Sequence, residues 1–148
     1  MTTRKRFEII ALDADDTLWQ NETLYHATQE KFRQLLTNYA DPEAVNQVLY
    51  ETEMSNLPHF GYGIKSFTLS MLETAVTLAD GHLTGQEVQA IINFAKEMVN
   101  APTQLLAHVA DTVPQLAQSH QLMLLTKGDL LDQEAKLARS GLGEYFTH

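Results

Sequence analysis

A short apolar run that ends abruptly in acidic residues constrains the fold of this chain more than any other feature. Phe7–Leu12 is apolar apart from Glu8 and has no polar alternation, which is typical of a strand buried on both faces, as in a parallel sheet. Three acids, Asp13, Asp15 and Asp16, follow directly. Because ligands of open α/β sheets bind beyond the carboxyl ends of the strands, we expect a binding site at this point.

The acidic cluster fits a cation site better than it fits the alternatives. An EF-hand calcium loop is excluded, since its sixth position would be Leu18 instead of glycine and its twelfth would be Leu24 instead of glutamate. A solvated turn is compatible with Asp and Thr residues. However, three carboxylates within four positions repel one another, which a turn does not require and which a cation would relieve.

The composition is that of an ordinary globular domain with an excess of acidic residues. Of the 148 residues, 44% are hydrophobic, and the formal net charge is −9, so a broad basic surface for nucleic acid is not expected. The absence of cysteine excludes disulfides and thiol catalysis. No apolar run approaches the roughly 20 residues of a membrane span. We therefore expect a soluble, cytoplasmic protein that binds neither nucleic acid nor membranes.

Residues 21–100 contain no strand-like segment. Their apolar residues recur at steps of three and four, which predicts a series of amphipathic helices. Asp41 followed by a proline, and the capping-box pattern Thr84–Glu87, mark the starts of two of them. The proline and glycines of Leu57–Gly63 predict a loop between two helices.

A second apolar run, Gln121–Thr126, predicts a second buried strand. It is preceded by a short helix predicted over Asp111–Ser119, with Pro114 in its first turn, and followed by a helix predicted over Leu130–Ser140. The hydroxyl of Thr126, together with backbone N–H groups in the turn before that helix, is suited to holding phosphate oxygens.

The helical stretch is too long for an ordinary connection between strands. About 80 residues of helix far exceed the dozen or so of a normal βαβ crossover. An insertion that packs as its own helical bundle explains this length. We therefore expect an α/β fold, in which residues 1–19 and 102–148 form a Rossmann-like parallel-sheet core and residues 20–101 form an all-helical domain.

The segment DADDTLW, residues 13–19, directly after a hydrophobic strand resembles the signature of the haloacid dehalogenase superfamily of aspartyl-nucleophile hydrolases, and most of all its small-molecule phosphatases. The resemblance implies that Asp13 attacks phosphorus and that Asp15 is the general acid and base. A carboxylate nucleophile divides phosphoryl transfer into two steps, and a second carboxyl two residues on lies on the same side of extended backbone. Magnesium held by Asp13 and Asp15 would screen them from an anionic substrate.

The resemblance extends to the second strand and to the helical insertion. Thr126 matches the second motif of the superfamily, and Lys136 matches a lysine that pairs with the nucleophile and the phosphate. In the superfamily a helical insertion at this place is a cap that excludes water and selects the substrate, so the loop His59–Lys65 is a candidate for substrate contact. Lys127 departs from the commoner asparagine. The residues expected to bind substrate are Ala14, Asp16, Lys65, Lys127 and Gly128.

The fourth motif of the superfamily, an acid on a further strand that completes the magnesium site, has no counterpart in this sequence. After Lys136 the only acid is Glu144, and no further strand is predicted. Two strands make a poor sheet, because one side of each has no partner. We therefore expect a piece of a longer hydrolase, or a homo-oligomer that completes its core by strand exchange. For these 148 residues alone we expect weak magnesium binding and little turnover.

Several functions remain open from the sequence. A phosphatase for a small phosphate ester is favoured by Asp15, because a dehalogenase of the same superfamily needs no acid at that position. The long helical insertion argues against a phospho-acceptor of the receiver type. A non-catalytic binding or scaffold module fits the missing fourth motif. The resemblance leaves open whether the ester is a nucleotide, flavin mononucleotide, phosphoglycolate or a sugar phosphate.

Overall fold

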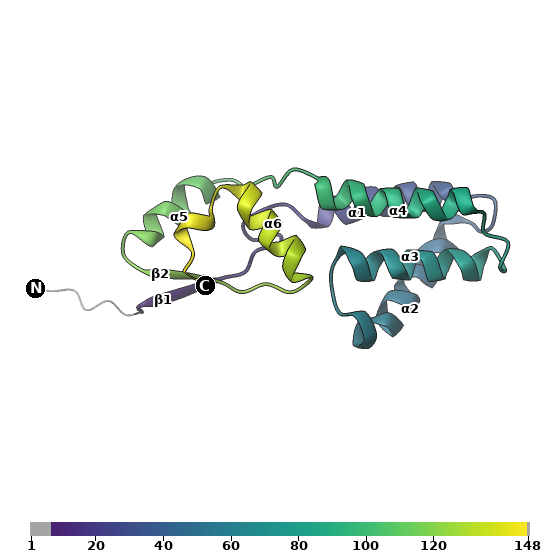
Figure 1. Cartoon of the computed structure of the whole chain (residues 1–148), viewed down its shortest axis with the longest axis horizontal. Coiled ribbons are helices and arrows are strands. Elements are labelled where there is room, and N and C mark those ends of the chain that lie inside the picture. Colours follow the sequence, from purple (N-terminus) through teal and green to yellow (C-terminus); the bar gives the residue numbers. More distant parts are fainter. Residues whose placement is uncertain (1–6, 148) are drawn as a thin grey trace, which may run out of the picture. The chain divides into compact units, whose positions relative to one another are not determined.

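In the computed structural model, which describes residues 7–147, the chain forms two compact units (Figure 1). The sheet unit comprises residues 7–22, 102–126 and 133–147, and the helical unit comprises residues 23–101 and 127–132. None of the helices in these described residues combines the length and apolarity needed to cross a bilayer. The elements along the chain are β1 (Ile9–Leu12), α1 (Glu22–Leu35), α2 (Pro42–Phe60), α3 (Ile64–Leu78), α4 (Gly85–Asn100), α5 (Val109–Ala117), β2 (Gln121–Leu124), α6 (Leu130–Ser140) and the 3₁₀ turn η1 (Gly143–Tyr145).

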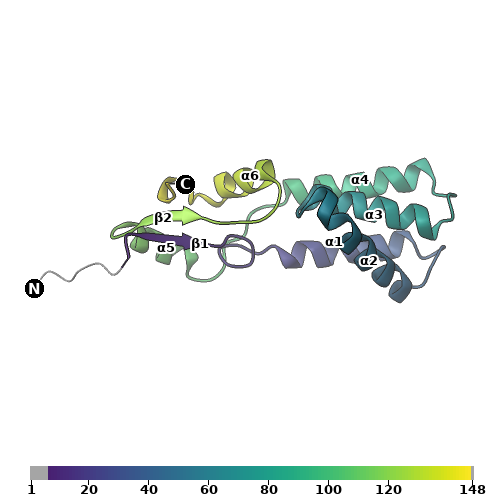
Figure 2. The same cartoon turned by 90° about the horizontal axis from the view of Figure 1, so that it is seen from below.

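The sheet unit is built on two parallel strands, which lie side by side in Figures 1 and 2. The register pairs Leu12 with Leu124, so both strands end at the same edge. On the other side of β2, Phe146 bridges to Leu122 in parallel orientation, and the Thr147 N–H donates to the Leu122 carbonyl at 2.9 Å. The sequence predicted no strand in this last part of the chain, yet these two residues take the position of a third parallel strand. The α/β class is confirmed.

The two faces of the sheet differ in burial. Ile10 and Leu122 belong to a core cluster with Val113 of α5 and Leu137 of α6. Alternate side chains of a strand point to opposite faces, and Ile9, next to Ile10, is 51% exposed. The prediction that β1 is buried on both faces is therefore wrong for the described residues. An apolar run indicates that burial of both faces of the strand is favourable. It does not indicate whether other elements cover both faces of the sheet.

The segments that enter and leave the helical insertion pair with each other inside the sheet unit. The Leu106 N–H donates to the Leu18 carbonyl and the Gln20 N–H donates to the Gln104 carbonyl, each at 2.9 Å. Trp19 lies between Leu18 and Gln20, bridges to Leu105 in antiparallel orientation, and is fully buried. A large buried aromatic thus anchors the point where the chain leaves the core.

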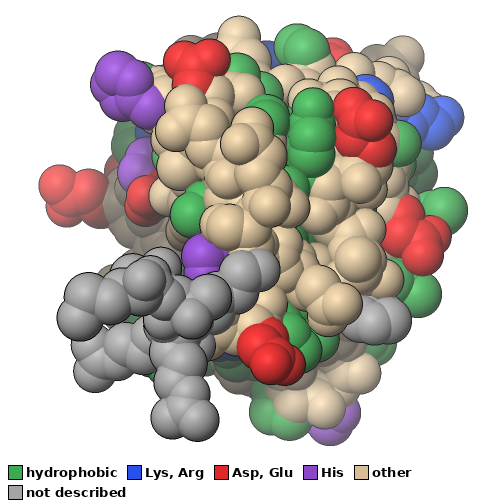
Figure 3. Space-filling model, turned by 90° about the vertical axis from the view of Figure 1, so that its left-hand side faces the viewer, with side chains coloured by type: hydrophobic (Ala, Val, Ile, Leu, Met, Phe, Trp, Pro, Cys, Tyr) green, Lys and Arg blue, Asp and Glu red, His purple; other side chains and the backbone are tan. Residues whose placement is uncertain are grey.

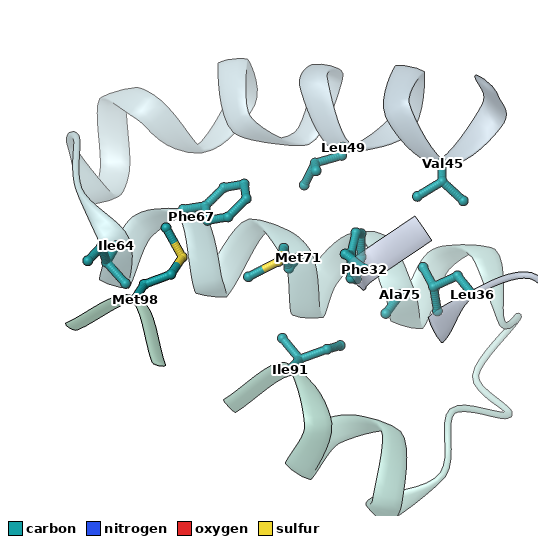
Figure 4. Packing of buried hydrophobic residues seen from close by; sticks show 10 residues of the cluster. All are labelled: Phe32, Leu36, Val45, Leu49, Ile64, Phe67, Met71, Ala75, Ile91 and Met98. Atoms are coloured by element: carbon teal, nitrogen blue, oxygen red, sulfur yellow. The ribbon is translucent and has the colours of Figure 1, made fainter. Parts of the chain in front are cut away.

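The helical unit contains α1 to α4 around one hydrophobic core. α3 packs against both α2 and α4, and Figure 4 shows side chains from these helices pointing toward one another. The periodicity of three and four residues predicted from the sequence is confirmed by the buried face of each helix. The buried members of this core are Phe32, Leu36, Val45, Leu49, Ile64, Phe67, Met71, Ala75, Ile91 and Met98.

Two helix starts in this unit follow the predicted capping chemistry. Asp41 accepts a hydrogen bond from the Ala44 N–H at 2.9 Å, with Pro42 at the first helical position. Thr84 and Glu87 form the predicted capping box at the start of α4. The Glu87 carboxylate also accepts a hydrogen bond from the Tyr39 hydroxyl at 2.9 Å, which joins the turn after α1 to α4.

Pro58 lies inside a helix where a loop was predicted, and Pro114 lies further into its helix than the predicted first turn. α2 continues through Pro58 to Phe60, so the predicted loop Leu57–Gly63 shrinks to Gly61–Gly63. α5 begins at Val109, two residues before the predicted start, and contains Pro114 beyond its first turn. A proline costs one helical hydrogen bond, and both helices continue past this loss.

The capping box generates a pH-dependent prediction. Hydrogen bonds from the Thr84 backbone N–H and hydroxyl hold the pKa of Glu87 below its ordinary value of 4.5. Because this pKa is lower in the folded protein, the stabilisation is present above the unfolded value and is lost as pH falls through the folded value. We expect Glu87→Gln to lower Tm at about pH 7, with a difference from the wild type that shrinks towards about pH 3.

Thermal unfolding by circular dichroism at both pH values measures this effect. The matched control is Glu51→Gln, which removes an exposed glutamate from α2, and for which we expect no such pH-dependent difference. An equal loss of Tm by Glu87→Gln at both pH values would contradict the assignment.

Candidate active site

The predicted nucleophile and the predicted phosphate-binding threonine lie at the same edge of the sheet. Asp13 directly follows β1, and Thr126 lies two residues beyond β2. The Leu125 N–H donates to the Leu12 carbonyl at 2.9 Å, so strand pairing continues up to the residue before Asp13. Both residues therefore lie at the carboxyl edge of the parallel strands, where open α/β sheets bind their ligands.

Asp15 accepts three hydrogen bonds through its carboxylate. Trp19 Nε1 at 2.8 Å and Lys136 Nζ at 3.1 Å donate to Oδ1, and Gln133 Nε2 donates to Oδ2 at 2.8 Å. The side chain of Lys136 is 8% exposed and that of Asp15 is 24% exposed, so the ion pair is only weakly screened by water. This contact joins the end of β1 to α6.

Lys136 also donates to Asn21 Oδ1 at 2.9 Å, beside the start of α1. The family resemblance implies that this lysine pairs with the nucleophile, whereas its ion pair in the structure is with Asp15, two residues further along. One ammonium group therefore contacts the second acid of the motif and the segment that enters the helical insertion.

Asp13 is exposed, as is Asp16, whereas Asp15 is half-buried. The Thr17 hydroxyl donates to its Oδ2 at 3.0 Å. Among residues 7–147 its Oδ1 accepts no hydrogen bond. A carboxylate that is oriented by one bond and accessible through its other oxygen has what a nucleophile or a metal ligand requires.

The Asp16 side chain has a structural role that differs from those of Asp13 and Asp15. Its backbone is left-handed, with φ of 58°, a conformation that Asp tolerates better than most residues. Its Oδ1 accepts hydrogen bonds from the backbone N–H groups of Asn21 at 2.8 Å and Glu22 at 3.0 Å, so it caps the start of α1. Ala14 is fully buried, and its carbonyl accepts from the N–H groups of the turn at residues 17 and 18.

The sequence reasoning missed the side chains that bond to Asp15. Trp19 lies four residues after Asp15 and within the recognised motif, but a tryptophan there reads as core. Gln133 lies three residues before Lys136 on α6, a spacing that puts both side chains on one face of the helix. That spacing is the signal that could have identified Gln133. Nothing in the sequence identifies Asn21.

Lys65, Lys127 and Gly128 belong to the helical unit. Lys65 Nζ donates to Asp129 Oδ2 at 2.9 Å, which holds the pKa of the Asp129 carboxyl below its usual value. Lys127 Nζ lies 5.1 Å from the centroid of the Tyr62 ring. These contacts join the start of α3 to the turn before α6. Substrate binding by the three residues stays a prediction.

Of the two predicted magnesium ligands, the Asp13 side chain fits the ion better. Magnesium takes oxygen ligands and is commonly held by one or two carboxylates plus substrate phosphate oxygens. Both oxygens of Asp15 already accept N–H donors, one of them cationic. Within residues 7–147 no three His, Asp or Glu side chains are grouped to hold a metal ion. Within the described chain, Asp13 is therefore the acid of this cluster with a side-chain oxygen open to a metal ion.

Charge on the surface gives no general attraction for an anion. Figure 3 shows one face of the molecule, on which acidic side chains are spread singly and Lys and Arg side chains are few. With a net charge of −9, the chain has no long-range field that draws in a phosphate ester. Attraction must come from local cations such as Lys136.

Known proteins resemble this chain in sequence and structure. It is 27% identical to the 5-amino-6-(5-phospho-D-ribitylamino)uracil phosphatase YigB of Escherichia coli (strain K12), over 95% of this chain and 60% of that protein. It is 36% identical, with a TM-score of 0.88, to a haloacid dehalogenase-like family hydrolase from Xanthomonas campestris, over 94% of this chain and 58% of that one. The chain thus spans about three fifths of the length of these relatives. No family model matches it.

Two more distant structures share the fold. The HAD-hydrolase YfnB from Bacillus subtilis, bound to magnesium, is 17% identical with a TM-score of 0.59, over 97% of this chain and 64% of that one. The L-2-haloacid dehalogenase from Xanthobacter autotrophicus is 19% identical with a TM-score of 0.58, over 95% of this chain and 54% of that one. By its parallel-sheet core, its helical insertion and its similarity to the Xanthomonas protein, the chain resembles the haloacid dehalogenase-like hydrolases in sequence and fold.

Proposed function

We propose that this protein hydrolyses a small phosphate monoester through an aspartyl-phosphate formed on Asp13. The observation that carries the proposal is the ion pair between Asp15 and Lys136, 121 positions apart, beside the exposed Asp13. A nucleophile needs access, and a general acid and base needs a fixed orientation. The similarity to a phosphatase supports a phosphate ester as substrate.

The proposed reaction has two steps. In the first, an oxygen of Asp13 attacks phosphorus, the bond from phosphorus to the ester oxygen breaks, and Asp15 in its protonated form gives that proton to the leaving oxygen. In the second, Asp15 takes a proton from water, the water oxygen attacks phosphorus, and the bond to Asp13 breaks to release inorganic phosphate. The donors Trp19 and Gln133 orient the Asp15 carboxyl for both transfers.

The remaining predicted residues bind or position the substrate in this scheme. Thr126 and Lys136 hold phosphate oxygens, and Asp13 would hold magnesium, which would neutralise charge on the phosphate. Because the Asp16 carboxylate is engaged at the start of α1, we assign it a positioning role in place of the predicted substrate contact. Substrate contacts are further assigned to Lys65, Lys127 and Gly128, whereas the predicted contact of Ala14 is not proposed again because this residue is fully buried.

Carbon–halogen hydrolysis is the second candidate, because an L-2-haloacid dehalogenase shares the fold. Displacement of halide also uses the first aspartate, but a halide ion leaves without a proton. The three donors that fix the orientation of Asp15 have no use in that reaction. They therefore favour the phosphatase.

Substitution of the two acids tests the proposal in the complete protein, because little turnover is expected of these 148 residues alone. We expect Asp13→Asn to abolish phosphate release from a panel of small phosphate esters in magnesium, because the covalent step is lost. We expect Asp15→Asn to lower kcat by about 10²–10⁴-fold, the usual contribution of a general acid and base. Intact-mass spectrometry of the acid-quenched wild type during turnover should show a phosphoryl adduct that is absent from Asp13→Asn.

The control variant is Asp111→Asn, which removes an exposed acid from the first turn of α5 and should leave turnover unchanged. Phosphate release that survives Asp13→Asn would rule out covalent attack by this residue. Halide release from 2-chloropropionate, with no phosphate release from any ester, would establish the dehalogenase instead. If neither phosphate nor halide is released, the result would support a non-catalytic module.

The ion pair between Lys136 and Asp15 predicts a stability effect as well. We expect Lys136→Met to reduce the free energy of unfolding by about 2 kcal/mol, because it leaves a partly buried carboxylate without its cation. In the Asp15→Asn background the same change should cost less, since no charge is then left unpaired. Urea unfolding of the four proteins measures the coupling.

Arg139→Met is the matched control, since it removes an exposed cation from the same helix. We expect it to change the free energy of unfolding by less than about 0.5 kcal/mol. A zero coupling between Lys136 and Asp15 would contradict the ion pair.

A further inference from the structure

The helical unit carries an apolar groove between α3 and α4, and Lys65 is the one lining residue to which the proposed chemistry assigns a role. Its volume is about 400 Å³, within the range of sites that hold small molecules. Its walls are contributed by one face of each helix, with residues spaced at steps of one, three and four along the chain. The lining residues are Ile64, Lys65, Thr68, Leu69, Ile92, Ala95, Lys96, Val99 and Asn100.

The groove exists because α4 carries more apolar residues than the core can bury. Ile91 and Met98 are fully buried in the core of the helical unit. Ile92 and Val99, one position further around the helix, line the groove instead, and Val99 is 38% exposed. Leu69 of α3 faces the same groove and is 43% exposed. Apolar side chains left in contact with water in a concave site favour an apolar ligand.

Of the two lysines that line the groove, one gives it a charge opposite to that of the chain as a whole. Lys65 is paired with Asp129. Lys96 is exposed, and no carboxylate among residues 7–147 pairs with it. In a chain with a net charge of −9, an unpaired ammonium beside an apolar groove is a local site for an anion.

We propose that this groove binds a small molecule with an apolar body and one anionic group. The apolar body occupies the space between Leu69 and Val99, and the anionic group meets the ammonium of Lys96. The argument requires only contacts within the helical unit, so it does not depend on the proposed phosphatase activity.

Titration of the whole chain with naphthalene-2-sulfonate, followed by amide chemical shifts, tests the proposal. We expect saturable binding, with shifts concentrated in α3 and α4. Val99→Ser should weaken binding about five-fold through the lost apolar contact. Lys96→Gln should weaken it about three-fold, the size of an exposed charge contact.

The matched control is Val76→Ser, the same substitution at a 50%-exposed valine of α3 that does not line the groove. We expect it to leave the affinity unchanged, and we expect the neutral analogue 2-naphthalenemethanol to bind more weakly than the sulfonate. Shifts spread over the whole chain without saturation would overturn the proposal. Equal weakening by Val76→Ser and Val99→Ser would also overturn it. Magnesium and phosphate esters are absent from the titration, so its failure and a failure of the phosphatase proposal are distinguishable.

Discussion

The ion pair between Asp15 and Lys136 is the contact on which the candidate site depends. Removing two charges from water costs several kcal/mol for each ion, and the pair alone does not guarantee a net gain. Here Trp19 and Gln133 donate further hydrogen bonds to the Asp15 carboxylate, and Asn21 accepts one from the Lys136 ammonium. The pair is thus held inside a bonded network, which fixes α6 against the end of β1 and leaves Asp13 accessible.

The features that the sequence predicted are those that depend on local physics. The helices follow from apolar residues at steps of three and four, and the starts at Asp41 and Thr84 follow from side chains that cap their own backbone. The meeting of Asp13 and Thr126 at one edge follows from parallel strand direction. Each of these needs only the neighbouring residues and the rule that parallel strands end together.

The features that the sequence did not predict depend on what lies across the fold. Asn21 and Gln133 form hydrogen bonds with Lys136 and Asp15, which lie more than a hundred positions away in the sequence. An asparagine or a glutamine does not by itself indicate such a partner. Ile9 was expected to be buried because it is apolar, but its exposure depends on which elements cover the second face of the sheet. Pro58 was expected to end a helix, but α2 continues past it to Phe60.

The structure also accounts for three carboxylates within four positions. The left-handed backbone of Asp16 turns its side chain toward the start of α1, where two backbone N–H groups stabilise its charge. Asp15 has a cation and two neutral donors of its own. For Asp15 and Asp16, protein donors therefore offset the repulsion between carboxylates that suggested a bound cation. Only Asp13 keeps an oxygen without a donor from the described chain, so it is where an added cation or an electrophilic phosphorus would gain most.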